Sequence, residues 1–172
     1  MTKMLLSIHV LASIVTIGPI TVAASAFPRY TRAATGGEAA DGGEESGERA
    51  AAVAGMLHRI CRAYTIVGLV VPVFGVATGA KLGVLTDAWL LVSMALTAIA
   101  AGLLALAILP RQARLLELAT AGTGTAGTGT GPGGAVTRRA EARLAGLTGI
   151  FNLLWAVVVV LMIVRPGSTT GA

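Results

Sequence analysis

Residues 144–164 read LAGLTGIFNLLWAVVVVLMIV, a run of 21 residues without a charged side chain. An α-helix rises about 1.5 Å per residue and the hydrocarbon core of a bilayer is about 30 Å thick, so this run is long enough to cross a membrane once. Arg143 precedes the run and Arg165 follows it, which places a charge at each end of the crossing. The stretch predicts a transmembrane helix.

Three other stretches of the chain share this lack of charge, if His9 is taken as neutral. One of them, residues 63–80, is short for a crossing, but it extends to residue 60 if the neighbouring arginines direct their charged groups to the lipid headgroups. The sequence therefore predicts an all-α bundle of four transmembrane helices in a single membrane domain. The predicted spans are residues 4–27, 60–80, 88–109 and 144–164.

The composition of the 172-residue chain agrees with a protein that has lipid as its solvent. It is 55% hydrophobic and 12% charged with a mean hydropathy of +0.81, whereas about a quarter of residues are charged in ordinary soluble domains. The net charge of +5 is carried by arginines that flank apolar runs, which favours the lipid bilayer over nucleic acid as the partner. Cys61 is the only cysteine, which excludes an internal disulfide and a thiolate metal cluster.

The placement of lysine and arginine predicts the orientation in the membrane. Lys3, Lys81 and Arg165 lie at one set of span ends, and the other ten of the 13 basic residues lie in or beside the connections that follow spans one and three. By the positive-inside rule, both of these connections face the cytoplasm. We predict a multi-pass protein of the plasma (inner) membrane with both termini outside. A cleaved signal peptide ending near Ala24-Ser25-Ala26 is the alternative for span one, but its removal places the arginines outside.

The two halves of the chain also resemble each other. Spans one and three both end in an apolar residue followed by Pro-Arg-x-x-Arg, at Pro28 and at Pro110. Each is followed by a connection, residues 31–54 and 120–137, whose richness in glycine and small or polar residues predicts a flexible cytoplasmic loop. The pattern indicates two helical hairpins related by a parallel pseudo-twofold axis, with chance similarity as the alternative.

His9 is the candidate site of the sequence, because it is the only histidine inside a predicted span and the only residue of the charge-free stretches that can readily gain a charge near neutral pH. In the structural interpretation, His9 hydrogen-bonds a neighbouring helix, with Ser93 or Thr78 as its partner. In the functional interpretation, His9 binds haem b or copper. His58 lies at the opposite membrane face, so the two histidines cannot ligate one haem or one metal within a chain. No dedicated metal site is predicted.

Three further polar or small residues are assigned to helix packing. Gly75 and Gly79 form a Gly-x-x-x-Gly pair, which permits close helix contact within the bundle or between protomers, and Asn152 is expected to hydrogen-bond another helix. Motifs of soluble enzymes are absent from the sequence, which contains no Cys-x-x-Cys, no His-Glu-x-x-His and no nucleophile elbow. The sequence therefore predicts no catalytic residue.

Residues 5–11, LLSIHVL, together with Trp89-Leu90 and residues 161–167, LMIVRPG, resemble a family of small bacterial four-helix proteins catalogued as predicted integral membrane proteins of unknown function. More distantly, His9 with Pro28-Arg29 is similar to the first helix of CopD-type copper-resistance proteins and of the membrane protoporphyrinogen oxidases. The latter resemblance implies a lysine shortly after the Trp-Leu pair, where this chain has Ser93. Ser93 is thus the second candidate cofactor-binding residue, at about the depth of His9.

Three classes of function follow from these residues. The first is a non-enzymatic structural or accessory subunit, as a homodimer or beside another membrane subunit. The second is a haem- or copper-binding redox protein that uses His9. The third is a small transporter, which is less favoured because a coupled pathway usually needs several ionisable groups in the membrane.

Overall fold

The computed structural model describes residues 2–35, 43–122 and 132–166 of the chain. Helices account for nearly all of these residues, and four helical stretches are long and apolar enough to cross a membrane. The predicted all-α fold with four membrane-length helices is therefore confirmed. The elements are α1 (Thr2–Ala34), α2 (Gly43–Val67), α3 (Val70–Leu82), α4 (Ala88–Gly102), the π-helix η1 (Leu103–Ile108), α5 (Leu109–Gly122) and α6 (Pro132–Val164).

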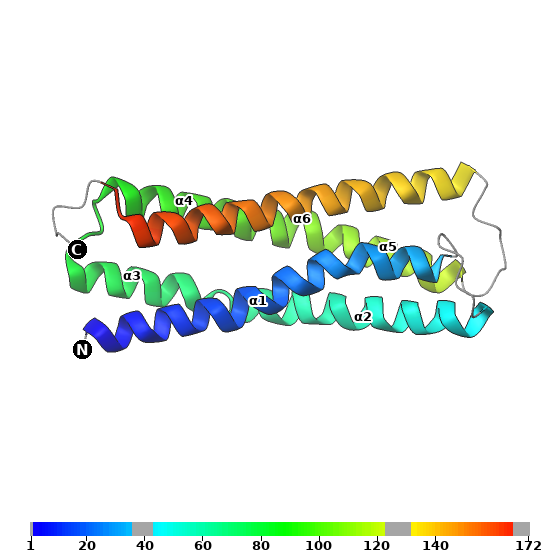
Figure 1. Ribbon diagram of the computed structural model, residues 1–172, viewed down its shortest axis with the longest axis horizontal. Helices are drawn as coiled ribbons and strands as arrows, with labels where there is room; N and C mark the ends of the chain where they lie inside the picture. The colour runs from blue at the N-terminus through cyan, green and yellow to red at the C-terminus, as the bar shows by residue number, and fades with distance from the viewer. Residues whose placement is uncertain (1, 36–42, 123–131, 167–172) are drawn as a thin grey trace.

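The elements form an elongated up-and-down bundle with four columns (Figure 1). Helices α1 and α6 are each one uninterrupted column, α2 continues into α3, and α4 continues through η1 into α5. Helix α1 packs against α2, α3 and α6, while α4 and η1 pack against α6, and α5 against α2. Helix α1 begins and α6 ends at the same end of the bundle, as a protein with four crossings requires.

The bundle surface is apolar, as expected for a protein that contacts lipid. Large aliphatic side chains such as Val22, Ile66 and Ile163 are more than half exposed. The interior is a cluster around Phe27 and Phe151, packed with aliphatic residues of η1, α5 and α6. Exposure of so many aliphatic side chains is unfavourable in water, whereas in a bilayer the acyl chains cover them.

The helices extend well beyond the apolar spans on the arginine-rich side. Helices α1 and α6 each contain 33 residues, a length of about 50 Å against a hydrocarbon core of about 30 Å. Small side chains allow close packing in this extension, where Ala34, Ala50, Ala51 and Ala119 form a buried cluster. The bundle therefore projects out of the membrane on the side that carries most of the arginines.

This extension corrects the predicted loop boundaries. Helices occupy residues 31–34 and 43–54 of the first predicted loop, and residues 120–122 and 132–137 of the second. The remaining central parts of both connections lie outside the described residues. The flexible-loop prediction relied on glycine and charge, but alanine, glutamate and arginine are also good helix formers. A polar helix that packs on its neighbours was therefore misread as a loop.

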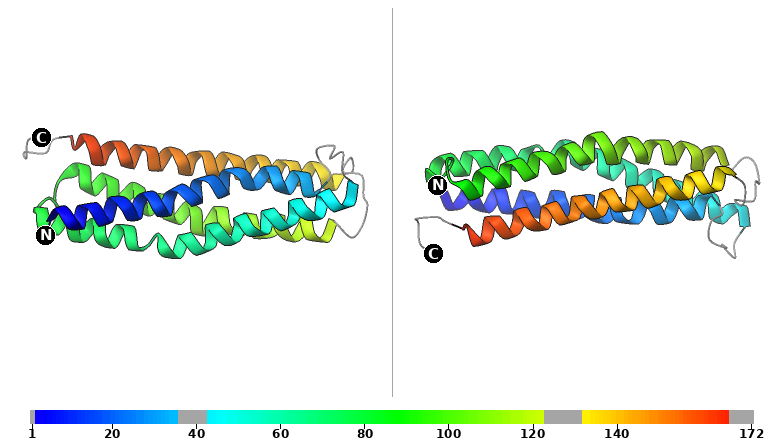
Figure 2. Two further views of the ribbon diagram at one scale, coloured as in Figure 1. Left: turned by 60° about the horizontal axis from the view of Figure 1, so that its bottom comes forward. Right: turned by 90° about the horizontal axis from the view of Figure 1, so that it is seen from above.

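The second column is interrupted between α2 and α3. Gly68 and Leu69 form a turn between α2 and α3 (Figure 2). Pro72 has no backbone N–H to donate to the Gly68 carbonyl, and that oxygen instead accepts from Val71 N at 3.2 Å. In the first half of the chain, the irregularity thus lies in the second column, between α2 and α3. In the second half it is the π-helix η1, which lies in the first column. These irregularities do not follow the predicted parallel repeat.

Candidate functional site

His9 lies on α1 opposite the start of α3, directly after the helix interruption. Its Nδ1 is 3.0 Å from the backbone carbonyl oxygen of Val71. Because a carbonyl oxygen can only accept, Nδ1 is the donor in this contact, and in the neutral imidazole Nε2 then holds the lone pair. The predicted hydrogen bond to a neighbouring helix is present, but its acceptor is a main-chain carbonyl and not the hydroxyl of Ser93 or Thr78.

Gly75 provides the space in which the His9 ring lies. A Cβ atom added to Gly75 would be 3.0 Å from His9 Cε1 and 3.4 Å from Nδ1, and all three of its nearest heavy atoms belong to this imidazole. At Gly79 an added Cβ would be 3.0 Å from a Leu90 methyl carbon and 3.1 Å from one of Leu85. Both glycines of the Gly-x-x-x-Gly pair therefore serve close packing within the chain.

The hydroxyl groups at similar depth are occupied within their own helices. Ser93 Oγ donates to the Trp89 carbonyl at 2.8 Å, and Thr78 Oγ1 donates to the Phe74 carbonyl at 2.7 Å. Such bonds to the preceding turn are a common way to satisfy a hydroxyl in an apolar environment. Ser93 Oγ therefore hydrogen-bonds within α4, and the hydrogen bond of His9 Nδ1 goes to Val71.

A second polar cluster joins α2 and α5 near the inner end of the apolar spans. His58 Nδ1 lies 3.2 Å from Gln112 Oε1, and Gln112 Nε2 donates to Cys61 Sγ at 3.7 Å. Gln112 and Cys61 are fully buried. Gln112 was not predicted as part of a site, because it lies between Arg111 and Arg114, beyond the predicted end of span three.

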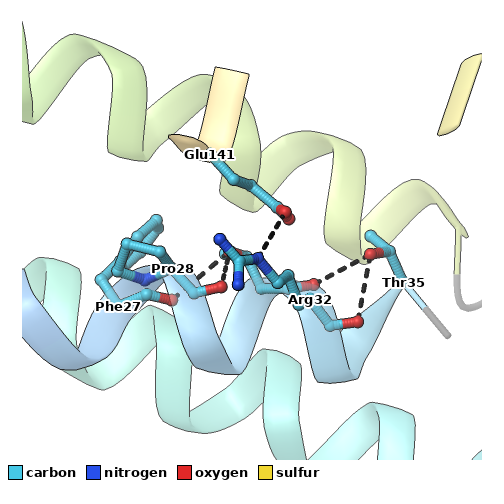
Figure 3. A network of polar contacts seen from close by, with 6 residues as sticks. Phe27, Pro28, Arg32, Thr35 and Glu141 are labelled. Atoms are coloured by element: carbon cyan, nitrogen blue, oxygen red, sulfur yellow. Dashed lines mark hydrogen bonds and ion pairs between the residues drawn. The ribbon is translucent and has the colours of Figure 1, made fainter. Parts of the chain in front are cut away.

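An ion pair joins α1 to α6. Arg32 Nε donates to Glu141 Oε2 at 3.1 Å, and Figure 3 shows the carboxylate pointing from α6 toward the guanidinium. The Glu141 side chain is 1% exposed and that of Arg32 is 44% exposed. The sequence analysis missed this pair, although Glu141 is a lone acidic residue between Arg139 and Arg143.

One side of α6 gathers polar atoms that lack a hydrogen-bond partner within the described residues. These are Glu141 Oε1, Thr148 Oγ1, Asn152 Oδ1 and Trp155 Nε1. Their spacing of seven, four and three residues places them along one side of a helix. Asn152 also donates through Nδ2 to Ser25 Oγ on α1 at 3.2 Å, which is the interhelical contact predicted for it. Helix α6 therefore carries a buried polar stripe, and Asn152 of this stripe contacts α1.

Comparisons of the chain with protein-family models, with curated proteins and with solved structures returned no match. The chemistry that the site can support therefore depends on the described side chains. Among them, no three His, Cys, Asp or Glu residues are close enough to hold a metal ion together. Of the His9 ring nitrogens, Nδ1 contacts the Val71 carbonyl, and Nε2 lies 3.8 Å from where a Cβ of residue 75 would stand.

Proposed function

We propose that this protein is a non-enzymatic, structural or accessory subunit of the plasma membrane, with both termini outside and the arginine-rich end of the bundle in the cytoplasm. The observation that supports the proposal is the hydrogen bond from His9 Nδ1 to the Val71 carbonyl. In this role the imidazole links α1 to the first turn of α3, directly after the break between α2 and α3. Gly75 gives the ring its place in that contact.

Replacing His9 with alanine is expected to lower the stability of the purified protein by about 0.5 to 2 kcal/mol, the range of hydrogen bonds between membrane helices. Thermal unfolding in detergent, followed by circular dichroism, measures this loss. Ser7→Ala is the matched control, because Ser7 Oγ donates only within its own helix, to the Lys3 carbonyl. Equal stability of both variants would contradict a structural role for His9.

A redox protein is the second candidate, and the tautomer of His9 supports it. Donation from Nδ1 to a carbonyl is the usual arrangement of histidines that bind metals through Nε2, because the hydrogen bond fixes the ring orientation. Protein produced with haem and copper supplied separates the two proposals. A Soret band or copper signal that His9→Ala abolishes and His58→Ala retains supports the redox candidate. Its absence in the wild-type protein removes it.

The orientation predicts which end of the bundle can be labelled from outside the cell. A cysteine at Thr86, in the exposed turn between α3 and α4, is expected to react with a membrane-impermeant maleimide in whole cells. A cysteine at exposed Ala121 is expected to react only after the membrane is opened. Cys61 is buried and serves as the internal control for background labelling. The opposite pattern would reverse the topology.

A further inference from the structure

The part of the bundle that extends beyond the apolar spans on the arginine-rich side contains a groove between α5 and α6, which is lined by arginines. It has a volume of about 590 Å³. Arg111 and Arg114 line it from α5, and Arg139 and Arg143 from α6, while the buried Leu115 contributes to the apolar part of the lining. All four arginine side chains are exposed, so their charged groups can reach a ligand in the groove.

The charge of this groove is not balanced by neighbouring carboxylates. Its lining includes no acidic residue, and none of the four arginines forms an ion pair with an acidic residue in the part of the chain that the structure describes. Arg111 donates one guanidinium hydrogen bond to the Ala107 carbonyl at 2.9 Å. By contrast, the lining of the groove between α2 and α5 includes the acidic Glu48 as well as Arg59. The groove between α5 and α6 therefore presents four positive charges to an anion.

Its position relative to the apolar spans indicates which anion is within reach. Arg111 follows the predicted end of span three and Arg143 precedes the start of span four, so both lie at the membrane boundary. Arg114 and Arg139 lie about one helical turn farther out, roughly 5 Å, which is within the headgroup layer. Phospholipid phosphates occupy this layer.

We propose that the arginine groove between α5 and α6 binds the headgroup of an anionic phospholipid from the adjacent leaflet. Arginine guanidinium groups form paired hydrogen bonds with phosphate oxygens, and arginines from two helices can hold one phosphate from both sides. The apolar part of the lining, which includes Leu115 and Ala140, suits the glycerol and first acyl carbons that follow the phosphate. A free phosphate ion uses only the charged part of such a groove.

The test measures lipid binding to the purified full-length protein in detergent by native mass spectrometry. Dioleoyl phosphatidylglycerol is the probe, and dioleoyl phosphatidylcholine, which is zwitterionic and has no net charge, is the comparison. The variant Arg114→Gln/Arg139→Gln removes one charge from each of the two helices that line the groove. The control Arg59→Gln/Arg62→Gln removes two charges from α2 at the same membrane boundary. Since each basic residue near an anionic lipid surface changes affinity by about fivefold, the groove variant is expected to bind phosphatidylglycerol about 25-fold more weakly than the wild type.

The control variant is expected to lose little of this affinity, and phosphatidylcholine is expected to bind all forms weakly. An equal loss in both variants would overturn the proposal, because lipid would then respond only to overall charge. So would equal binding of the two lipids. Displacement of phosphatidylglycerol by equimolar inorganic phosphate would assign the groove to a soluble anion instead. If the double variant melts earlier than the wild type, the single variant Arg139→Gln is measured, with an expected loss of about fivefold.

Discussion

Replacing Arg32 with methionine is expected to lower the free energy of unfolding by about 3 kcal/mol, near the lower end of the range for breaking a buried ion pair. Glu141 is 1% exposed, so without the guanidinium its carboxylate is left without a compensating charge. Arg32 is 44% exposed, and solvent screening places the expected loss at the lower end of the range. Denaturant unfolding in detergent micelles near pH 7 measures the effect.

Two further variants separate the ion pair from a general effect of charge. Arg29→Met removes an exposed arginine one helical turn earlier on α1, and it is expected to change stability by no more than about 0.5 kcal/mol. Arg32→Met/Glu141→Leu removes both partners and is expected to recover most of the loss, since an apolar pair of similar size can replace a buried ion pair. If Arg32→Met costs no more than Arg29→Met, the contact does not stabilise the bundle.

The number of helices was predictable because the lengths of the apolar runs alone determine it. Charged residues cannot remain in the hydrocarbon core at low cost, so the gaps between them mark the crossings. The helical extension beyond the membrane was not predictable from the same signal. Around Ala50 and Ala119 the sequence mixes alanine and glycine with charged residues, and only the packing of one helix on another distinguishes such a stretch from a loop.

The polar contacts were harder to predict, for two physical reasons. Arg32 and Glu141 are 109 positions apart, and the side of α6 that faces α1 becomes known only when the columns are packed. The acceptor for His9 is a main-chain carbonyl. Because every residue has one, the sequence does not indicate which carbonyl accepts the bond. The need for a partner at His9 was predictable from the cost of an unsatisfied polar group in hydrocarbon. The identity of that partner follows only from how α1 packs against α3.

Replacing Gly75 with valine is expected to destabilise the protein by about 1 to 3 kcal/mol, the usual cost of adding bulk to a packed interior. The Cβ alone would lie 3.0 Å from His9 Cε1, and valine adds two methyl groups beyond it. The imidazole must then move away from α3, which lengthens or breaks its hydrogen bond to the Val71 carbonyl. Gly18→Val is the control, because an added Cβ at Gly18 has no neighbour within 4 Å.

The same substitution in a His9→Ala background decides whether the cost arises from the imidazole. All three heavy atoms nearest to the added Cβ belong to His9, so in that background the valine methyl groups enter the space that the ring occupied. The cost of Gly75→Val is expected to fall below about 0.5 kcal/mol there, which corresponds to a coupling of at least about 1 kcal/mol between the two positions. Thermal unfolding of the four proteins in one detergent gives this coupling. Additive effects would mean that Gly75 is needed for the backbone of α3 and not for the place of the His9 ring.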